Sequence, residues 1–515
     1  MKLMTGALIP KIDDYAHSVL NISKKSLVLK SAEAVFSAVS EALSPESLAV
    51  ILAGKGNNGA DGYALSTLFV GVCRVKVVDV FGMGQRSEEG KYYLGRAKEL
   101  GVDIIPLDDS AYEEIERADI LIEAIVGTGV TGSLGEPLLG IAAAIEKSRA
   151  KLKVAIDLPI GVNPDTGAAV SCAPHFDKTV ALSFVKPGVL SYPGREYAGE
   201  IVYSDLALPK EKILSVFETK YTYTDEEFAT EALPKRGKNT NKGSYGRLAI
   251  LSGSEKYGGA PRLTLEAALR GGVGYVEFVG EEGQNKEMLR SFPEAIYKVR
   301  PAFDKLSKTD IEEIIAATEA CGAIVIGPGC GMSEGLVNLL GGFLAIEGAT
   351  LVIDADGINA LSELIERRNF SLGAAKRRII LTPHPGEFSR LTGAPVSEIQ
   401  GNRLELSVRF AKENSVVLLL KGAGSIITDG DAVYINGTGS AALAKAGSGD
   451  ALAGLVGAFV ALGSFEDDAV ATALAAYIHG AAGDTLEEEL SSYGVTPSDL
   501  PKEMARQIRR IERIQ

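Results

Sequence analysis

The feature that most constrains the fold is an alternation of apolar, strand-like runs with helix-like segments along the 515-residue chain. The apolar runs lie at residues 47–53, 75–80, 118–125, 153–159, 246–253, 274–280, 323–329, 350–356, 378–384 and 416–422. Continuous apolar runs of this length are typical of parallel strands that are covered on both faces. The alternation therefore predicts an α/β protein with mostly parallel sheets flanked by helices.

The pattern is interrupted around residues 209–245, where the chain is polar, charged and rich in Pro and Gly. A polar segment of this kind is typical of a boundary between domains. We place the boundary near 210–225 and expect one domain over 1–215 and a second over 216–515. Within the interruption, the Lys- and Asn-rich piece 235–243 is expected to be a surface loop.

Charge and cysteine content exclude several classes of function. The formal net charge of −14 argues against nucleic-acid binding and against an acidic membrane surface. The four cysteines form no CxxC pair, so a disulfide or thiolate-metal scaffold is not expected. The most apolar stretch, 451–465, is too short to span a bilayer and predicts a buried helix. We expect a cytoplasmic location.

The first half contains a glycine loop between a strand and a helix. Gly54, Gly56 and Gly59 fit the G-x-G-x-x-G pattern of dinucleotide-binding folds, and Asp79 follows at the distance of a ribose contact. An NAD-dependent dehydrogenase is therefore one hypothesis. The insert "NNGADG" goes beyond the pattern, because asparagine amides can meet a ligand with amide and hydroxyl groups, or a cation held by oxygens.

Two further loops follow strands of the first half. Residues 123–137 carry four glycines, and Asp157 lies where the strand at 153–159 ends. The carboxyl ends of the strands are the ligand-binding edge of an open α/β sheet. Asp157 is therefore either a turn former or a functional residue.

The second half carries several glycine-bearing motifs, but no G-x-x-x-x-G-K-[ST] phosphate loop. Asp354 and Asp356 lie at a strand end, where they can act near Mg²⁺ or form a turn. In "AKAGSGDALAG" (444–454) the carboxylate of Asp450 stands among glycines ahead of an apolar stretch. It is either a helix N-cap or a base that takes the proton of an attacking hydroxyl, while the loop amides stabilise a phosphoryl group.

The first half, over most of residues 1–210, resembles the epimerase domain of the bifunctional NAD(P)H-hydrate repair enzymes through "AGKGNNGADGYALS", "VGTGVTGSLGEP" and "VAIDLPIGVNPDTG". This resemblance implies a Rossmann-like three-layer sandwich with Asp157 as a catalytic residue. It implies a potassium ion on Asn58, Glu123 and, through its carbonyl, Ile160. The implied hydrate contacts are Asp157 together with Asn57, Asn58, Gly59, Ala60, Asp61, Gly127, Thr128, Gly129, Val130, Thr131, Gly132 and Ser133.

The second half, over roughly residues 225–510, resembles the ribokinase-like ADP-dependent NAD(P)H-hydrate dehydratases through "TPHPGE", "GPGCG", "KGAGS" and "GTGSAALAKAGSGDALAG". This resemblance implies that Asp450 is catalytic. The implied hydrate contacts are Ala260, Gly329, His384 and Asp450. The implied nucleotide contacts are Lys421, Gly422, Ala423, Gly424, Ser425 and Gly449.

Together the two resemblances imply repair of NADH or NADPH that has taken up water across a double bond of the nicotinamide ring. The first domain interconverts the R and S hydrates, and the second dehydrates the S hydrate with ADP as phosphoryl donor, releasing AMP and phosphate. The implied cofactors are potassium and Mg²⁺. The expected partners are NADH-hydrate, NADPH-hydrate and ADP, with no nucleic acid and no membrane, in a homo-oligomer that is a tetramer or larger.

Three alternatives stay open from the residues alone. The first half can be a dehydrogenase or a non-catalytic NAD sensor. The second half can be a vitamin-precursor or sugar kinase, whose product is a stable phosphoester.

Overall fold

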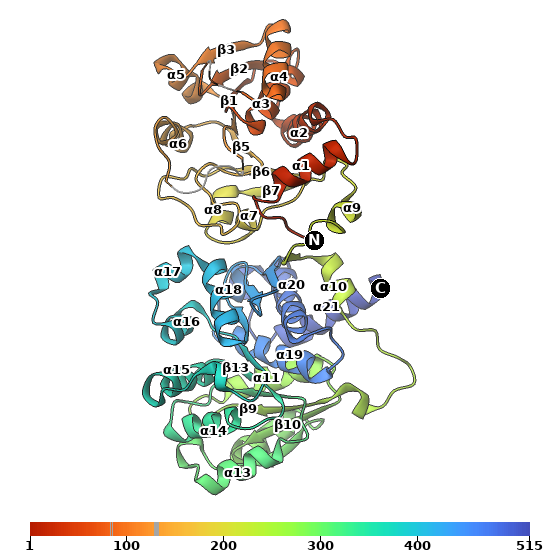
Figure 1. Cartoon of the computed structure of the whole chain (residues 1–515). Helices are drawn as coiled ribbons and strands as arrows, with labels where there is room; N and C mark the ends of the chain where they lie inside the picture. Colours follow the sequence, from red (N-terminus) through yellow and green to blue (C-terminus); the bar gives the residue numbers. More distant parts are fainter. Residues whose placement is uncertain (83, 85, 128–132) are drawn as a thin grey trace. The chain divides into compact units, whose positions relative to one another are not determined.

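The computed structural model describes residues 1–82, 84, 86–127 and 133–515 (Figure 1). The chain divides into two compact units, one formed by Lys2–Tyr221 and the other by Thr222–Gln515 together with Met1. We refer to them as the N-terminal and the C-terminal unit.

Within its described residues the N-terminal unit holds a seven-stranded sheet in the order β3-β2-β1-β4-β5-β6-β7. The strands pair in parallel throughout. They are β1 (Leu48–Ala53), β2 (Arg74–Asp79), β3 (Asp103–Pro106), β4 (Ile120–Ala124), β5 (Leu152–Ile156), β6 (Lys178–Leu182) and β7 (Glu200–Ser204). The four apolar runs predicted in this half coincide with β1, β2, β4 and β5, so the predicted parallel α/β sheet is confirmed.

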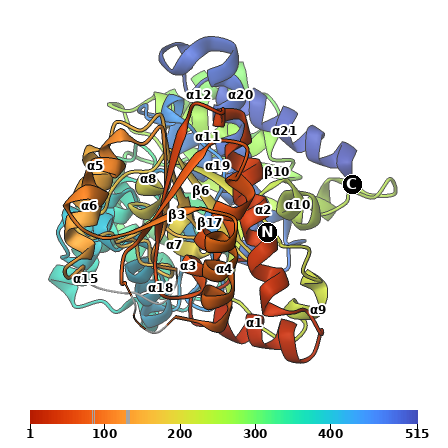
Figure 2. The ribbon, with the colours of Figure 1, turned by 90° about the horizontal axis from the view of Figure 1, so that it is seen from above.

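Helices cover both faces of this sheet, which makes the predicted three-layer sandwich. α5 and α6 pack on one face, while α2, α3 and α4 form a hydrophobic core with the other (Figures 1 and 2). The helices are α1 (Ile9–Ser18), α2 (Lys24–Val39), α3 (Asn57–Phe69), α4 (Glu88–Glu99), α5 (Asp109–Arg117), α6 (Leu138–Lys147), α7 (Pro187–Leu190), α8 (Gly194–Ala198) and α9 (Lys210–Leu214).

Among the residues described, the C-terminal unit holds a ten-stranded sheet in the order β11-β10-β9-β12-β13-β14-β15-β16-β17-β8. The pairs from β11 to β15 are parallel, whereas β16 pairs antiparallel with β15 and β17. The strands are β8 (Tyr221–Thr224), β9 (Arg247–Leu251), β10 (Tyr275–Gly280), β11 (Ile296–Val299), β12 (Ala323–Ile326), β13 (Thr350–Ile353), β14 (Ile379–Leu381), β15 (Val417–Leu420), β16 (Ile426–Thr428) and β17 (Val433–Asn436).

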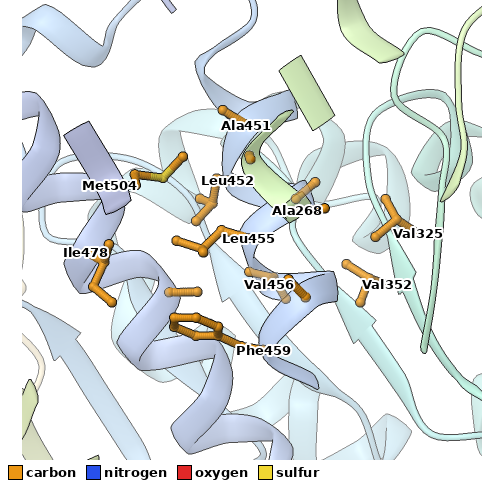
Figure 3. Close-up of a cluster of buried hydrophobic side chains, with 14 of the residues drawn as sticks. Ala268, Val325, Val352, Ala451, Leu452, Leu455, Val456, Phe459, Ile478 and Met504 are labelled. Atoms are coloured by element: carbon orange, nitrogen blue, oxygen red, sulfur yellow. The ribbon is translucent and has the colours of Figure 1, made fainter. Parts of the chain in front are cut away.

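Helix α19 is the centre of one core of this unit. Its Leu455, Val456 and Phe459 pack towards Val325 and Val352 of the sheet and towards α11, α20 and α21 (Figure 3). The helices of the unit are α10 (Glu226–Ala232), α11 (Gly259–Arg270), α12 (Glu282–Ser291), α13 (Lys308–Ala317), α14 (Glu334–Leu344), α15 (Asp356–Arg368), α16 (Pro385–Thr392), α17 (Val396–Gly401), α18 (Arg403–Asn414), α19 (Ser448–Leu462), α20 (Asp468–Gly494) and α21 (Leu500–Ile514). The predicted buried helix at 451–465 is therefore confirmed.

In each unit the order of the strands reverses once next to a strand that precedes a glycine loop. The reversal lies between β1 and β4 in the N-terminal unit and between β9 and β12 in the C-terminal unit. Ligands of open α/β sheets bind outside the carboxyl ends of the strands at such a reversal. The sheet topology therefore places two candidate sites, one per unit. Across the described residues, no helix is both long and apolar enough to cross a membrane.

Candidate functional site

The glycine loop of the N-terminal unit is built for close backbone contact. A Cβ at Gly54 would lie 2.0 Å from the carbonyl oxygen of Ile125, and a Cβ at Gly59 would lie 2.0 Å from that of Gly54. A Cβ at Gly56, in contrast, would meet no atom within 4 Å. Gly54 and Gly59 thus close the turn between β1 and α3, and Gly56 faces open space at the start of α3.

Asp79, the residue expected to contact the ribose in a dehydrogenase, is engaged by a neighbouring side chain. Asp79, at the end of β2, forms an ion pair with Arg86, and both side chains are largely buried. A carboxylate that is engaged with a neighbouring guanidinium has little capacity left for ribose hydroxyls. The geometry therefore argues against the dehydrogenase hypothesis.

A cavity of about 590 Å³ opens at the carboxyl ends of β1, β4 and β5. It brings together Asn57, Asn58, Asp61, Gly127 and Asp157 from the three predicted loops. Three other predicted contacts do not line the cavity. Gly59 packs against the backbone of Gly54, Ala60 is fully buried in the hydrophobic core, and Ser133 is exposed. Five more, Thr128, Gly129, Val130, Thr131 and Gly132, lie outside the described residues.

Asp157 follows β5 with a positive φ of 70°, which is uncommon for a residue other than glycine. Its carboxylate accepts hydrogen bonds from the ammonium group of Lys186 and, at 3.2 Å, from the amide of Leu182. The Lys186 side chain is only 1% exposed and also donates to the carbonyl of Leu182 at 3.1 Å. Such a fixed, buried ion pair argues against a simple turn former and favours a functional role for Asp157.

Two further carboxyl groups, Asp13 of α1 and Asp61 of α3, line the same cavity. Burial raises the pKa of Asp13 to about 6 and the pKa of Asp61 well above its usual range. Repulsion from Asp157 adds to both shifts, while Lys186 opposes them. Sequence reasoning missed Asp13, which lies in an ordinary amphipathic helix, and gave Lys186 no role, although its position after a strand was a signal.

Glu123 of β4 is fully buried next to this cavity, and burial raises its pKa to about 7. Its carboxylate accepts hydrogen bonds from the amides of Ile125 at 2.7 Å, Val126 at 3.2 Å and Ile160 at 3.1 Å. The side-chain Nδ2 of Asn58 donates to the carbonyl of Ile156 at 3.1 Å. The buried Oδ1 of the same side chain has no hydrogen-bond partner among the described residues.

In the C-terminal unit, the loops after β9 and β12 are hydrogen-bonded to each other. Ser252 donates to the carbonyl of Pro328 at 2.6 Å, and Ser254 donates to that of Gly329 at 2.9 Å. Gly329 has a φ of 62°, and a Cβ there would lie 2.8 Å from the Cβ of Ala260 at the start of α11. The structure thus brings together two of the predicted hydrate contacts, Ala260 and Gly329.

Asp450 is the third residue of α19 and not its N-cap. The N-cap is Gly447, with a φ of 105°, which has no side chain that could cap the helix. Burial, and next the charge of Asp354, raise the pKa of Asp450 to about 7, although Lys421 opposes the shift. This arrangement contradicts the N-cap alternative and fits a base at the amino end of a helix.

Lys421, at the end of β15, links Asp450 to the neighbouring loops. Its ammonium group donates to Asp354 at 2.7 Å, lies 4.0 Å from Glu387, and would be 3.2 Å from a Cβ at Gly449. The hydroxyl of Thr382 also donates to Asp354, at 2.8 Å. The predicted contacts Lys421, Gly449 and Asp450 therefore lie together, beside the acidic pair of Asp354 and Glu387.

His384 has a structural role that the sequence left open. It is the N-cap of α16, and its Nδ1 accepts hydrogen bonds from the amides of Gly386 at 3.0 Å and Glu387 at 3.3 Å. Its Nε2 therefore carries the proton and lies 3.4 Å from the Glu387 carboxylate. Since the ring is 53% exposed, it can still meet a ligand.

The turn between β15 and β16 is partly exposed and has backbone angles that favour glycine at two positions. Gly422 and Gly424 have φ values of 140° and 55°, and the Ser425 hydroxyl donates to the carbonyl of Gly422 at 2.9 Å. Ala423 lies between them and is exposed. Five of the six predicted nucleotide contacts, residues 421–425, thus form one accessible turn, and the sixth, Gly449, lies in the first turn of α19.

His479, which sequence reasoning gave no role, supports the first turn of α19. Its Nε2 lies 3.1 Å from both the hydroxyl and the carbonyl oxygen of Ser448. Burial lowers the pKa of His479 to about 4, so the ring is neutral. Its place inside an alanine-rich helix gave no signal in the sequence.

Comparisons with known proteins match both units of the chain. The family model described as NAD(P)H-hydrate dehydratase matches residues 248–506, and the model described as YjeF-related protein N-terminus matches residues 24–188. The bifunctional NAD(P)H-hydrate repair enzyme of Pyrobaculum aerophilum is 31% identical over 470 residues, which are 90% of this chain and 89% of that relative.

Two solved structures are similar to parts of the chain. A ribokinase-like superfamily protein from Enterococcus faecalis covers 57% of this chain and 98% of its own, with a TM-score of 0.50 and 24% identity. The ADP/ATP-dependent NAD(P)H-hydrate dehydratase of Bacillus subtilis, co-crystallised with ATP and Mg²⁺, covers 56% of this chain and 98% of its own, with a TM-score of 0.49 and 31% identity. The first likeness confirms the ribokinase-like fold. With both family models matched and the bifunctional relative aligned over nine-tenths of the length, the chain belongs to the family of bifunctional NAD(P)H-hydrate repair enzymes.

Proposed function

We propose that the chain repairs hydrated NADH and NADPH in two steps. The N-terminal unit interconverts the R and S hydrates, and the C-terminal unit returns the S hydrate to NADH or NADPH at the expense of ADP. The observation that carries the proposal is the setting of Asp450, a partly buried carboxyl at the amino end of α19 beside the half-buried ammonium group of Lys421. A base and an anion-stabilising helix end are what phosphoryl transfer to a hydroxyl requires.

The dehydration is a transfer followed by an elimination. Asp450 takes the proton of the hydrate hydroxyl, whose oxygen attacks the β-phosphorus of ADP, and the bond to AMP breaks. The phosphate then leaves with the electrons of the C–O bond as the neighbouring carbon loses a proton, which restores the ring double bond. Phosphate is a far better leaving group than hydroxide, and the products are NADH or NADPH, AMP and phosphate.

The nucleotide is proposed to lie on the turn from Lys421 to Ser425 and at Gly449. The amides at the start of α19 and the ammonium group of Lys421 then meet its phosphates. Ala260, Gly329 and His384 are proposed to hold the hydrate near Asp450. They surround the carboxyl ends of β9, β12 and β14, where an α/β sheet binds its ligands.

Magnesium is proposed to bind with the nucleotide and to neutralise charge on its phosphates. In the described part of the chain, no three His, Cys, Asp or Glu side chains are grouped to hold a metal ion. This fits Mg²⁺, which takes one or two carboxylates plus phosphate oxygens and water. Asp354 and Asp356 are the candidate carboxylates, each with one oxygen already hydrogen-bonded within the protein.

Potassium is proposed for the N-terminal unit. The buried Oδ1 of Asn58, which has no partner among the described residues, and the carbonyl of Ile160 supply neutral oxygens. The buried carboxylate of Glu123 supplies the charge. Since Glu123 is already held by three amides, its contribution is chiefly electrostatic. When bound, the ion would offset negative charge at the cavity.

Product analysis tests the proposal. Pure S hydrate is incubated with the full-length protein, Mg²⁺ and either ADP or ATP, and the products are separated by chromatography. The proposal expects free phosphate, AMP and NADH or NADPH in equal amounts with ADP. A stable phosphoester of the hydrate would show a kinase without the elimination step and contradict the proposal, and equal turnover with ATP would contradict ADP as the preferred donor.

A further inference from the structure

Several carboxyl groups line the cavity of the N-terminal unit. Asp13, Asp61 and Asp157 line it, while Asp157 is the one that is paired directly with the buried ammonium group of Lys186. The hydroxyl of Ser183, a residue only 4% exposed, also lines the cavity and has no partner among the residues described. A buried hydroxyl without a partner points to a polar ligand at this place.

The surroundings of Asp61 and Asp157 differ in a way that assigns opposite states to them. Asp157 receives hydrogen bonds from an ammonium group and an amide, both of which stabilise a carboxylate. Asp61 is only 8% exposed and forms no ion pair with a lysine or arginine among the described residues, and the nearby Ser31 hydroxyl donates to the carbonyl of Leu27 at 3.1 Å. A buried carboxyl without a cationic partner is more stable in its neutral, protonated form.

We propose that Asp61 is the proton donor of the epimerase reaction and that Asp157, held by Lys186, is the proton acceptor. The assignment rests on the proposed function of this unit. It adds a proton donor, Asp61, to Asp157, which the family resemblance already implies to be catalytic.

The epimerisation proceeds by loss and re-addition of water. The hydrated carbon is bonded to the ring nitrogen, so the nitrogen electron pair can expel the hydroxyl as Asp61 protonates it to water. A water molecule then attacks the resulting iminium carbon from the opposite face, restores the nitrogen pair, and gives its proton to Asp157. The proton has then moved from Asp61 to Asp157, and Asp13, which interacts with both groups, is placed to return it.

The charged and titratable groups that face Asp61 come from several elements. Lys186 and Asp157 flank it, Asp13 of α1 repels it, and Tyr93 of α4 lies within its electrostatic range. Lys24 of α2, Glu89 of α4 and Lys55 of the glycine loop complete the charged lining of the cavity. Burial among them raises the pKa of Asp61 well above its usual range, which favours the protonated form of this group.

The test uses the full-length protein without nucleotide, so that the dehydratase cannot consume the product. Pure R hydrate is added, and the appearance of S hydrate is followed by chromatography. Asp61→Asn, which keeps the size of the side chain, should lower kcat by roughly 10²–10⁴, the range for a lost general acid, with little change in KM. Asp14→Asn is the matched control, because Asp14 is an exposed neighbour of Asp13 outside the cavity lining and should leave kcat unchanged.

Each outcome decides one question. If the unmutated protein does not exceed the spontaneous rate, the proposed function fails, whatever Asp61 does. If the unmutated protein is active and Asp61→Asn keeps its kcat, the assignment of Asp61 is overturned. Should Asp61→Asn fail to fold, the unmutated pH profile decides. A donor carboxyl must be protonated, so kcat should fall as the pH rises through its raised pKa, and a kcat that increases steadily with pH overturns the assignment.

Discussion

At the scale of single residues, the position of Asp450 carries most of the account. It stands in the first turn of α19 without capping it, since Gly447 is the N-cap. Asp450→Asn removes the base but keeps the shape, so dehydration of the S hydrate should fall by roughly 10²–10⁴. ADP should still bind, because the loop amides and Lys421 remain. An unchanged dehydration rate at saturating ADP would leave Asp450 with a structural role alone.

The raised pKa of Asp450 gives this step a pH dependence. A base is active when ionised, and burial raises the pKa of Asp450 to about 7. The kcat/KM for dehydration should therefore rise with pH, with a midpoint near that value. The measurement is initial rates across a buffer series at fixed ionic strength, and a profile that is flat through neutral pH would contradict the assignment.

The free energy of unfolding tests the ion pair between Lys186 and Asp157. Lys186 is buried and acts on Asp157, Asp13 and Asp61 together, whereas Asp157 is one of three carboxyl groups around it. Lys186→Met should therefore destabilise the N-terminal unit by about 3–5 kcal/mol, the range for breaking a buried pair, and Asp157→Asn should cost less. Calorimetry of the full-length variants measures this. Lys76→Met, which removes a half-exposed lysine paired with Glu114, is the control and should cost about 1 kcal/mol or less.

Some residues of the two sites could be predicted from the sequence, and others could not. Asp450 and Asp157 stand in motifs whose glycines mark them, whereas Asp13 and Lys186 become part of the site only when α1 and the segment after β6 reach the cavity. His479 is similar, because its contact with Ser448 spans two helices. Contacts between distant segments leave no local pattern, so sequence reasoning could not find them.

At the scale of elements, small residues let α19 approach α11. A Cβ at Gly454 would lie 2.2 Å from the carbonyl oxygen of Thr264, so Gly454→Ala must push the helices apart. Overpacking of this kind costs about 1–3 kcal/mol. Because Asp450 lies one turn earlier, the dehydration rate should fall as well. Gly283→Ala is the control, since a Cβ there meets no atom within 4 Å, and it should change neither thermal stability nor rate by much.

A Gly454→Ala variant with unchanged melting temperature and rate would show that the α11–α19 contact tolerates displacement. A loss of stability with an unchanged rate would assign the α11–α19 contact to packing alone, whereas a loss of both would show that it also positions Asp450.

The strands also differ in how well the sequence predicts them. The central strands β1, β4, β9, β12 and β13 are buried on both faces and appear as apolar runs. The partly exposed strands β3, β7 and β11 carry polar residues and were not singled out. A strand with solvent on one side lacks the continuous apolar run by which buried strands are identified.

At the scale of the whole molecule, each unit has its own sheet and core, and the division falls between Tyr221 and Thr222. We predict that residues 1–220 and 221–515 fold when expressed apart and keep epimerase and dehydratase activity, respectively. Circular dichroism and the two separate assays measure this. An epimerase half that works only when fused to the other half would contradict the two-unit reading.

The most direct test of the account follows pure R hydrate with ADP and Mg²⁺ in the full-length protein and two variants. The unmutated protein should convert all of the hydrate to NADH or NADPH. Asp157→Asn should consume R hydrate only at the spontaneous epimerisation rate, which is measured without enzyme, while it dehydrates S hydrate normally. Asp450→Asn should stall at a mixture of R and S hydrates. If Asp450→Asn still forms NADH or NADPH at the unmutated rate, or if Asp157→Asn epimerises R hydrate normally, the assignment of one reaction to each unit through these carboxyl groups is wrong.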